Sequence, residues 1–404
     1  MLYQSLLTDA LREQCDEFVQ FEREWRDDVF DYAQRLRALD GLRAEDVSVR
    51  LGAMREPGAL PSDELERTGS VLLPFGVSWR THEEARRWAI DALEGRVTFA
   101  ADGSQLLPGR EISLPVAAVQ VAWFENPHTR DGKYEKQARF QIIPPGALLE
   151  DEAGRVNAET VVALRRFQLE VAELRRFLSS KRDWRERKER PPVAFFDGTL
   201  LISIAQPRTK IQERYVDAMV ELVRLSRETE VPLVGFVDQS YARDLISLLD
   251  ALNKSGAHQS RALYDAQLLR ALEADGQPLL KAWGDRTAFC YCLRHGLTES
   301  FSDDAGRPLV GFTYLQTTGN GAPARLDIPS WVYEAGLLEE VLDAVRAECV
   351  GGLGYPYAIE TADAAAVITT RDREQFLHAL QDFAREGNFS FQVSRKAASK
   401  VRRR

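Results

Sequence analysis

The sequence has 404 residues, of which 44% are hydrophobic, and a formal net charge of −9 at pH 7. This length is sufficient to bury one large core or two smaller ones. The negative charge excludes a surface that is basic throughout, and no apolar stretch approaches the roughly 20 residues of a membrane-spanning helix. The first residues lack the basic segment of a secretory signal, so we expect a cytoplasmic protein with no membrane partner.

Cysteine and histidine give little indication of a metal site. The four cysteines include one close pair, Cys290 and Cys292, in an alternating run where both side chains should share one strand face. A zinc site usually needs two such pairs or histidines at ligand spacing, and the five histidines are scattered. We therefore interpret the cysteines as packing residues.

The N-terminal region, residues 1–94, is predicted to be helical. Apolar residues recur at roughly helical spacing from Leu6 to Leu36, and a further helix is expected from about His82 to Leu93. Proline and glycine interrupt the pattern at 57–58 and 74–76. This region carries no recognisable chemistry, so scaffolding or dimerisation is its expected role.

Residues 95–404 are predicted to form an α/β domain. Three strands, at 97–102, 112–124 and 138–143, resemble an antiparallel meander. Helices and strands then alternate up to residue 252, which implies parallel pairing. The fold class is therefore α/β, with a mixed sheet flanked by helices. The remaining expected strands are 287–293, 309–315 and 325–329, and the remaining expected helices are 332–349 and 371–385.

Two apolar runs end in Asp-Gly followed by a hydroxyl residue, at Asp102 and at Asp197. Each predicts a buried strand with an aspartate at its exit, where glycine lets the chain turn or be approached closely. One such motif alone would usually start a hairpin turn. Because neither copy is followed at once by a matching strand, the pair favours a shared site for a divalent cation.

A cation such as Mg²⁺ or Mn²⁺ takes oxygen ligands from several segments of a chain, so further carboxylates are needed. The helix expected at 158–180 places Arg166 and Glu170 four residues apart on one face, with Glu173 three residues further. An ordinary surface ion pair is the alternative interpretation. Asp238 follows the strand expected at 232–237 and is either a further ligand or a helix N-cap.

These motifs, in this order, resemble the NurA nucleases. The matching segments are Asp102–Ser104, Arg166–Glu170, Phe196–Leu200 and Gly354–Tyr357, the last being Gly-Tyr-Pro-Tyr. The resemblance covers about residue 97 to the end of the chain, and assigns 95–404 as the nuclease domain. It implies an RNase H-like core and manganese-dependent DNA cleavage, with Mg²⁺ as an alternative ion.

The resemblance also implies a homodimer that acts with the hexameric ATPase HerA in DNA end resection and double-strand break repair, as a 5′–3′ exonuclease with single-strand endonuclease activity. Asp102, Glu170 and Asp197 match the family's metal ligands, with Glu173 as an alternative to Glu170. The nucleotide-binding motif Gly-x-x-x-x-Gly-Lys-Ser/Thr is absent from the sequence, so processive resection would need a separate motor.

The sequence departs from the family after Tyr357. Where many relatives have a histidine, it has Glu360-Thr-Ala-Asp363, so Asp363 is a candidate replacement. Asp327 is a further candidate near the site. An acidic site repels DNA, so nearby cations are expected to contact the phosphates. The candidates for this role are Arg166, Arg208, Lys210, Arg243 and Arg325.

Two alternatives to this function remain open at the level of the sequence. One is a related RNase H-like nuclease that acts on RNA or on branched DNA. The other is a catalytically weak or silent scaffold that binds DNA or the ATPase. Like charges brought together without a cation cost stability, which argues against a silent scaffold.

Overall fold

The computed structural model describes residues 2–109, 112–149, 157–202, 209–253, 259–260, 262–272, 277–390 and 392. The chain divides into two compact units, each assembled from two segments. The first unit comprises Met1–Trp79 and Phe236–Ser330, and the second comprises Arg80–Gly235 and Trp331–Arg404. This division differs from the single boundary expected at residues 94 and 95, because a later segment of the chain joins the N-terminal helices.

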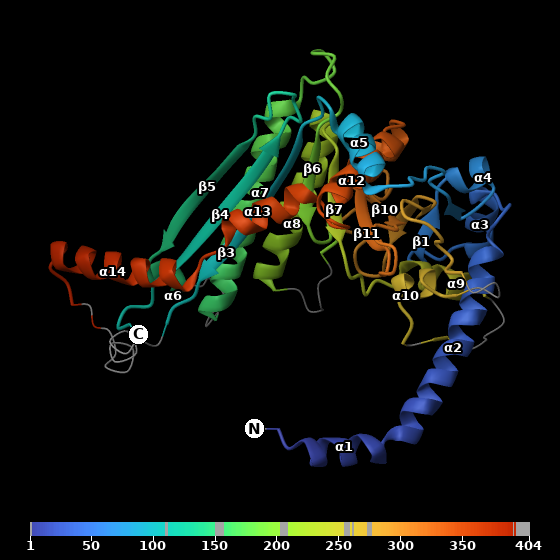
Figure 1. Cartoon of the computed structure of the whole chain (residues 1–404), viewed down its shortest axis with the longest axis horizontal. Helices are drawn as coiled ribbons and strands as arrows, with labels where there is room; N and C mark the ends of the chain where they lie inside the picture. Colours follow the sequence, from blue (N-terminus) through green and yellow to red (C-terminus); the bar gives the residue numbers. More distant parts are fainter. Residues whose placement is uncertain are drawn as a thin grey trace. The chain divides into compact units, whose positions relative to one another are not determined.

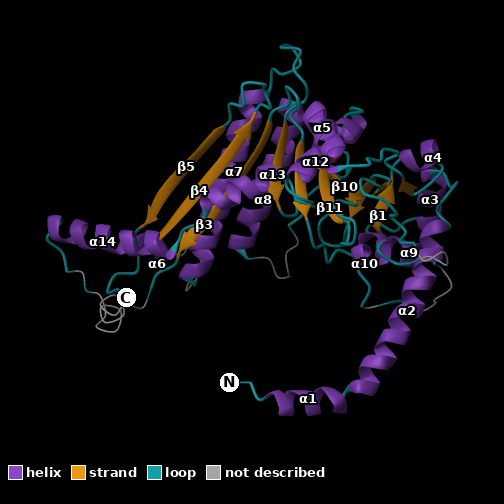
Figure 2. Cartoon of the chain, viewed as in Figure 1, coloured by secondary structure: helices purple, strands orange, loops and turns teal. Residues whose placement is uncertain are grey.

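The second unit contains a mixed sheet with the strand order β7-β6-β3-β4-β5, whose strands are labelled in Figure 1 and coloured orange in Figure 2. β3 pairs antiparallel with β4, β4 pairs antiparallel with β5, and β6 lies parallel to β3. This arrangement confirms the expected mixed sheet. The strands are β3 (Thr98–Leu106), β4 (Ala117–Asn126), β5 (Glu135–Ile143), β6 (Val193–Asp197) and β7 (Leu233–Val237), and the unit boundary falls within β7.

The helices of the second unit largely follow the sequence prediction where side chains cap them. Thr81 accepts a hydrogen bond from the backbone of Glu84 before α5, and Asn157 accepts one from Glu159 before α7. The helix expected at 332–349 is in fact two helices, separated by a turn at Gly336, which has a φ of 71°. The helices are α5 (His82–Leu93), α6 (Pro145–Leu149), α7 (Ala158–Lys181), α8 (Lys210–Thr229), α11 (Ser330–Glu334), α12 (Leu338–Gly351), α13 (Tyr357–Ala366) and α14 (Thr370–Glu386).

Helices cover both faces of this sheet (Figure 1). Alternate residues of β3 point to opposite faces, as in any strand. Phe99 stacks on Phe177 of α7, with 4.5 Å between the ring centroids. Thr98 points the other way and donates a hydrogen bond to Glu348 of α12. We name the two sides the α7 face and the α12/α13 face.

The first unit has an antiparallel sheet with the strand order β1-β9-β10-β11, in which β8 pairs with β10 and β2. Its N-terminal part contains predicted helices, with a break at Gln14, but the expectation of a wholly helical region is wrong, because two short segments pair with later strands as β1 and β2. Across the described residues, no helix has both the length and the apolar character needed to cross a bilayer. The elements are β1 (Gly58–Pro61), β2 (Leu72–Leu73), β8 (Arg286–Thr287), β9 (Cys290–Leu293), β10 (Val310–Leu315), β11 (Ala324–Pro329), α1 (Gln4–Glu13), α2 (Cys15–Arg37), α3 (Ala44–Leu51), α4 (Glu64–Thr68), α9 (Asp244–Leu252) and α10 (Asp265–Leu269).

Candidate active site

Asp102 lies within a strand and not at a strand exit, which corrects the sequence prediction. β3 continues through Gly103 and Ser104 to Leu106, and Asp102 is paired with Ala122 of β4. The strand extends because β4 offers a regular antiparallel partner along its whole length, which outweighs the low strand propensity of Asp-Gly. Asp197, in contrast, is the last residue of β6, as predicted.

The register between β3 and β6 brings these two aspartates side by side. Thr98 pairs with Val193, and the same offset along both strands places Asp102 beside Asp197. Phe196 points to the α7 face, where its ring contacts Phe167, so Asp197 points to the opposite face. Both aspartates therefore face the α12/α13 side of the sheet.

The C-terminal part of the second unit adds two residues to this pair. Tyr355, just before α13, donates a hydrogen bond of 2.5 Å from its hydroxyl to Oδ1 of Asp197. Asp363 of α13 lies within hydrogen-bonding range of Asp102. The candidate replacement for the family's histidine is thus brought to the site, and we call Asp102, Asp197 and Asp363 the aspartate cluster.

Glu170 lies on the α7 face, in the space that the absent side chain of Gly103 leaves open. A Cβ atom on Gly103 would lie 2.4 Å from Oε1 of Glu170 and 2.7 Å from Cγ of Arg166. Glu170 is 7% exposed, and its Oε1 has no hydrogen-bond partner among the described residues. Nη1 of Arg166 lies 3.5 Å from that oxygen and donates a hydrogen bond of 3.0 Å to the carbonyl of Gly103.

Burial and neighbouring charges raise the pKa values of two carboxyl groups of the site, those of Glu170 and Asp102. Burial raises the pKa of Glu170 to about 7, Arg166 opposes the shift, and the charges of Asp102 and Asp197 add to it. Burial also raises the pKa of Asp102 to about 6; the backbone of Gly103 opposes this shift, and Asp363 and Asp197 add to it. The four carboxyl groups therefore form one electrostatically linked set of like charges.

This set has the donor chemistry of a site for Mg²⁺ or Mn²⁺. These ions take oxygen ligands, and here four carboxyl groups interact electrostatically, and one buried oxygen among them lacks a hydrogen-bond partner within the described chain. As the side chains stand, no group of three His, Cys, Asp or Glu residues in the described ranges could hold an ion. Binding would therefore require the carboxylates to move closer together than they stand in this structure.

The structure distinguishes Glu170 from its alternative, Glu173. Glu173 is buried and forms ion pairs with Arg139 at 2.9 Å and with Arg176 at 2.8 Å. Two cations already neutralise this carboxylate, although its Oε2 also lacks a hydrogen bond, whereas Glu170 faces Gly103 and is repelled by the aspartates. Of the two glutamates, Glu170 is therefore the one that interacts with the aspartates.

Asp238 and Asp327 belong to the first unit and are not part of the carboxylate set described above. Asp238 is exposed, and it is not an N-cap, because α9 begins at Asp244. Asp327 is buried within β11 and accepts a hydrogen bond of 2.7 Å from Nε of Arg325. Its carboxylate thus has a structural partner in the core of its own unit.

The predicted phosphate contacts differ in their accessibility. Arg325 is 1% exposed and paired with Asp327 and Asp244, so the expectation that it contacts DNA is wrong for this arrangement. The guanidinium of Arg243 donates a hydrogen bond to the carbonyl of Ser260. The other three predicted phosphate contacts are Arg166, Lys210 and Arg208. Arg166 is half-buried at the site, Lys210 is exposed at the start of α8, and Arg208 lies outside the described residues.

A family model described as the NurA domain matches residues 96–368. No curated protein sequence matches the chain. Among solved structures, the catalytic domain of human endonuclease V shares 14% identity, over 74% of this chain and 94% of that chain, with a TM-score of 0.31. A likeness at this level carries no information about substrate or mechanism.

The family match places the protein in the general class of nucleases. The matched span is more than half of the chain and contains every member of the carboxylate set. The chain belongs to the NurA family.

Proposed function

We propose that this nuclease is a metal-dependent deoxyribonuclease. The observation that carries the proposal is the aspartate cluster with Glu170, in which neighbouring like charges add to the raised pKa values of Asp102 and Glu170. Four acidic groups held together in this way cost stability unless a cation or protons neutralise them. A cation site is the function that best accounts for retaining them.

Asp102, Glu170, Asp197 and Asp363 would hold the ion, with Mn²⁺ proposed and Mg²⁺ as the alternative. When bound, a divalent ion lowers the pKa of a coordinated water and stabilises the negative charge that develops on a phosphate. Tyr355 orients the carboxylate of Asp197 through its hydroxyl.

Two positively charged side chains, those of Arg166 and Lys210, have different roles in this proposal. Arg166 keeps Glu170 directed towards Gly103 and carries a positive charge at the site. Lys210 is exposed in the same unit and is available for a backbone phosphate. Such contacts bind DNA without reading its sequence, which suits an enzyme that resects ends of any sequence.

We further propose that the protein acts as a homodimer with a HerA-type hexameric ATPase in DNA end resection and break repair, with 5′–3′ exonuclease and single-strand endonuclease activity. The sequence has no phosphate-binding loop of its own, which supports a separate motor. The helices α1 and α2 expose large apolar side chains, a feature of interaction surfaces. These residues include Leu6, Leu11, Phe18 and Phe21.

Cleavage of end-labelled single- and double-stranded DNA tests the activity, with Mn²⁺, Mg²⁺ or a chelator. We expect metal-dependent cutting that Asp102→Asn and Asp197→Asn abolish while circular dichroism shows that both variants remain folded. Asp217→Asn is the matched control, because Asp217 is an exposed residue of α8 whose carboxylate is not in the set. Labels at the two ends report the direction of digestion.

A protein that is inert with every metal, both alone and with an added HerA-type ATPase, would contradict the proposal. Normal cutting by the Asp102 and Asp197 variants would contradict it equally. In the first case the catalytically silent scaffold takes its place. Parallel reactions with RNA and branched DNA distinguish the remaining alternative.

A further inference from the structure

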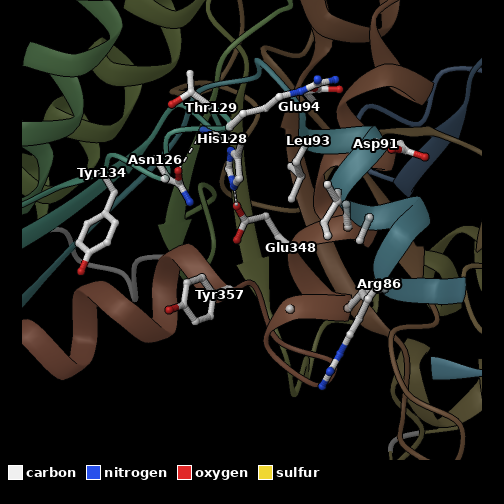
Figure 3. Close-up of a pocket in the computed structure, with 17 residues that line it drawn as sticks. Arg86, Asp91, Leu93, Glu94, Asn126, His128, Thr129, Tyr134, Glu348 and Tyr357 are labelled. Atoms are coloured by element: carbon white, nitrogen blue, oxygen red, sulfur yellow. Dashed lines mark hydrogen bonds and ion pairs between the residues drawn. The ribbon is translucent and has the colours of Figure 1, made fainter. Parts of the chain in front are cut away.

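The second unit contains a cavity of about 650 Å³ that the proposed cleavage does not use (Figure 3). Its walls come from α5, from the turn between β4 and β5, and from the C-terminal end of α12, with Tyr357 of α13 beside them. The volume falls within the range of about 300–1,000 Å³ that is usual for pockets that bind small ligands. The cavity is therefore large enough to hold a ring system such as a nucleobase.

Aromatic rings stand at the edge of this cavity. Tyr134 is 63% exposed and Tyr357 is 45% exposed, and both line it. The buried ring of Phe124 supports them, with centroid distances of 5.4 Å to Tyr134 and 5.9 Å to Tyr357. Ala89 and Leu93 of α5 add apolar wall. Exposed tyrosines held on a rigid base are the usual surface on which a flat ligand stacks.

The polar groups at the back of the cavity already have partners. Glu348 is 2% exposed and accepts hydrogen bonds from the hydroxyl of Thr98 at 2.7 Å and from the backbone of Ala358 at 2.8 Å. Nδ1 of His128 lies 2.7 Å from the carbonyl oxygen of Arg96. A ligand would therefore gain mainly from contact with rings and apolar walls, with little selection for one base over another.

The turn that forms one wall is held in an unusual conformation. His128 has a φ of 47°, which is uncommon for a residue other than glycine. Its backbone donates a hydrogen bond of 2.9 Å to the side chain of Asn126, and its carbonyl accepts one of 3.1 Å from Gly95. Strained backbone that persists in this way tends to occur at ligand sites, so the wall is preformed.

The cavity lies on the same side of the sheet as the aspartate cluster. Thr98, which contacts Glu348, points to the α12/α13 face, and Phe124 is paired with Ala100 of β3. Thr98 and Ala100 are four and two residues before Asp102 on β3, which corresponds to about 7–13 Å along the strand at 3.3 Å per residue. At about 3.4 Å per stacked nucleotide, this distance corresponds to two to four nucleotides.

We propose, relying on the deoxyribonuclease function above, that this cavity binds one unpaired base of the DNA strand two to four nucleotides from the bond that is cleaved. The base stacks against Tyr134 and Tyr357. Arg86 lines the cavity from α5 with an exposed side chain and meets the backbone phosphate. The cavity thereby sets a requirement for unpaired DNA close to the cut, without sequence preference.

Binding in the presence of a chelator tests the site without catalysis. Fluorescence anisotropy compares an oligothymidine with an oligomer of the same length whose nucleotides lack bases. We expect wild-type protein to bind the oligothymidine at least about fivefold more tightly, and Tyr134→Ala with Tyr357→Ala to remove most of that difference. The corresponding Tyr→Phe pair keeps the rings and should retain it, as should Tyr241→Ala, which alters an exposed tyrosine of the first unit.

Cleavage of oligomers with a single abasic nucleotide then locates the site. For wild-type protein we expect a dip in cutting, that is, reduced cleavage of the bonds two to four nucleotides from the abasic position. This dip should disappear in the double alanine variant. Equal affinity of wild-type protein for the two oligomers, or a dip that persists in the alanine variant, would overturn the proposal. Loss of all cutting with the affinity difference intact would instead remove the nuclease function and leave base binding standing.

Discussion

Replacement of Gly103 by alanine should displace Glu170 while leaving β3 in place. The added Cβ would lie 2.4 Å from Oε1 of Glu170 and 2.7 Å from Cγ of Arg166, well inside van der Waals contact. The backbone itself accepts alanine, because Gly103 has no positive φ and pairs regularly with Val121 of β4. The conflict therefore falls on the two side chains of α7.

Overpacking of this kind costs about 1–3 kcal/mol, and the smaller entropy of the unfolded alanine chain returns about 0.4–1 kcal/mol. We expect a net loss of about 1–2 kcal/mol in the free energy of unfolding, measured with urea in metal-free buffer. Moving a carboxylate of the site should also weaken Mn²⁺ binding about 10- to 100-fold, measured by titration calorimetry. Cleavage should fall with the affinity for the ion.

Gly319→Ala is the matched control, because no atom lies within 4 Å of the Cβ that it would add and Gly319 has no positive φ. Its stability should stay within about 0.5 kcal/mol of the wild-type value. A Gly103→Ala protein with wild-type stability and wild-type Mn²⁺ affinity would refute the reasoning, since it would mean that Glu170 does not depend on the space beside Gly103.

Three further predictions concern single side chains. Burial raises the pKa of Glu170 to about 7, so above pH 4.5 the folded protein binds more protons than the unfolded chain. The free energy of unfolding should therefore fall as the pH rises towards 7. Glu170→Gln should reduce this fall by up to about 3 kcal/mol, measured by urea unfolding of the metal-free protein. Arg325→Met should cost about 3–5 kcal/mol, because Asp327 loses its buried counter-ion, with DNA affinity per folded molecule unchanged; a folded variant with weakened DNA binding would restore Arg325 as a phosphate contact. Tyr355→Phe should slow cleavage about 10- to 100-fold at unchanged melting temperature, because Asp197 loses a charge-assisted hydrogen bond; an unchanged rate would mean that Asp197 is positioned without it.

Elements with strong local signals could be predicted from the sequence. The prediction of α5 was correct because Thr81 supplies an N-cap, and α7 begins beside the capping residue Asn157. The break between α11 and α12 was missed, although Gly336 is a recognisable helix terminator. The helix α13 was missed, because its N-cap is Pro356 and no side-chain hydrogen bond caps its start.

The site was predicted only in part, because its geometry depends on pairing over long distances in the sequence. Asp-Gly at Asp102 indicated a strand exit, but pairing with β4 extends the strand past it. Asp363 had no signal of its own beyond the position of a missing histidine. The burial of Arg325 could not be foreseen, since its partner Asp244 is far away in the sequence and only the fold brings the two together.

The discontinuity of the second unit sets the order in which its chemistry is completed during synthesis. Asp102, Glu170 and Asp197 leave the ribosome in the first segment, whereas Tyr355 and Asp363 follow only after all of Phe236–Ser330 has been made. At about 5–20 residues per second, roughly 10–30 s separate Asp197 from Asp363. The nascent chain therefore carries most of its acidic groups long before the cluster can close, and the site is one of the last parts of the protein to be finished.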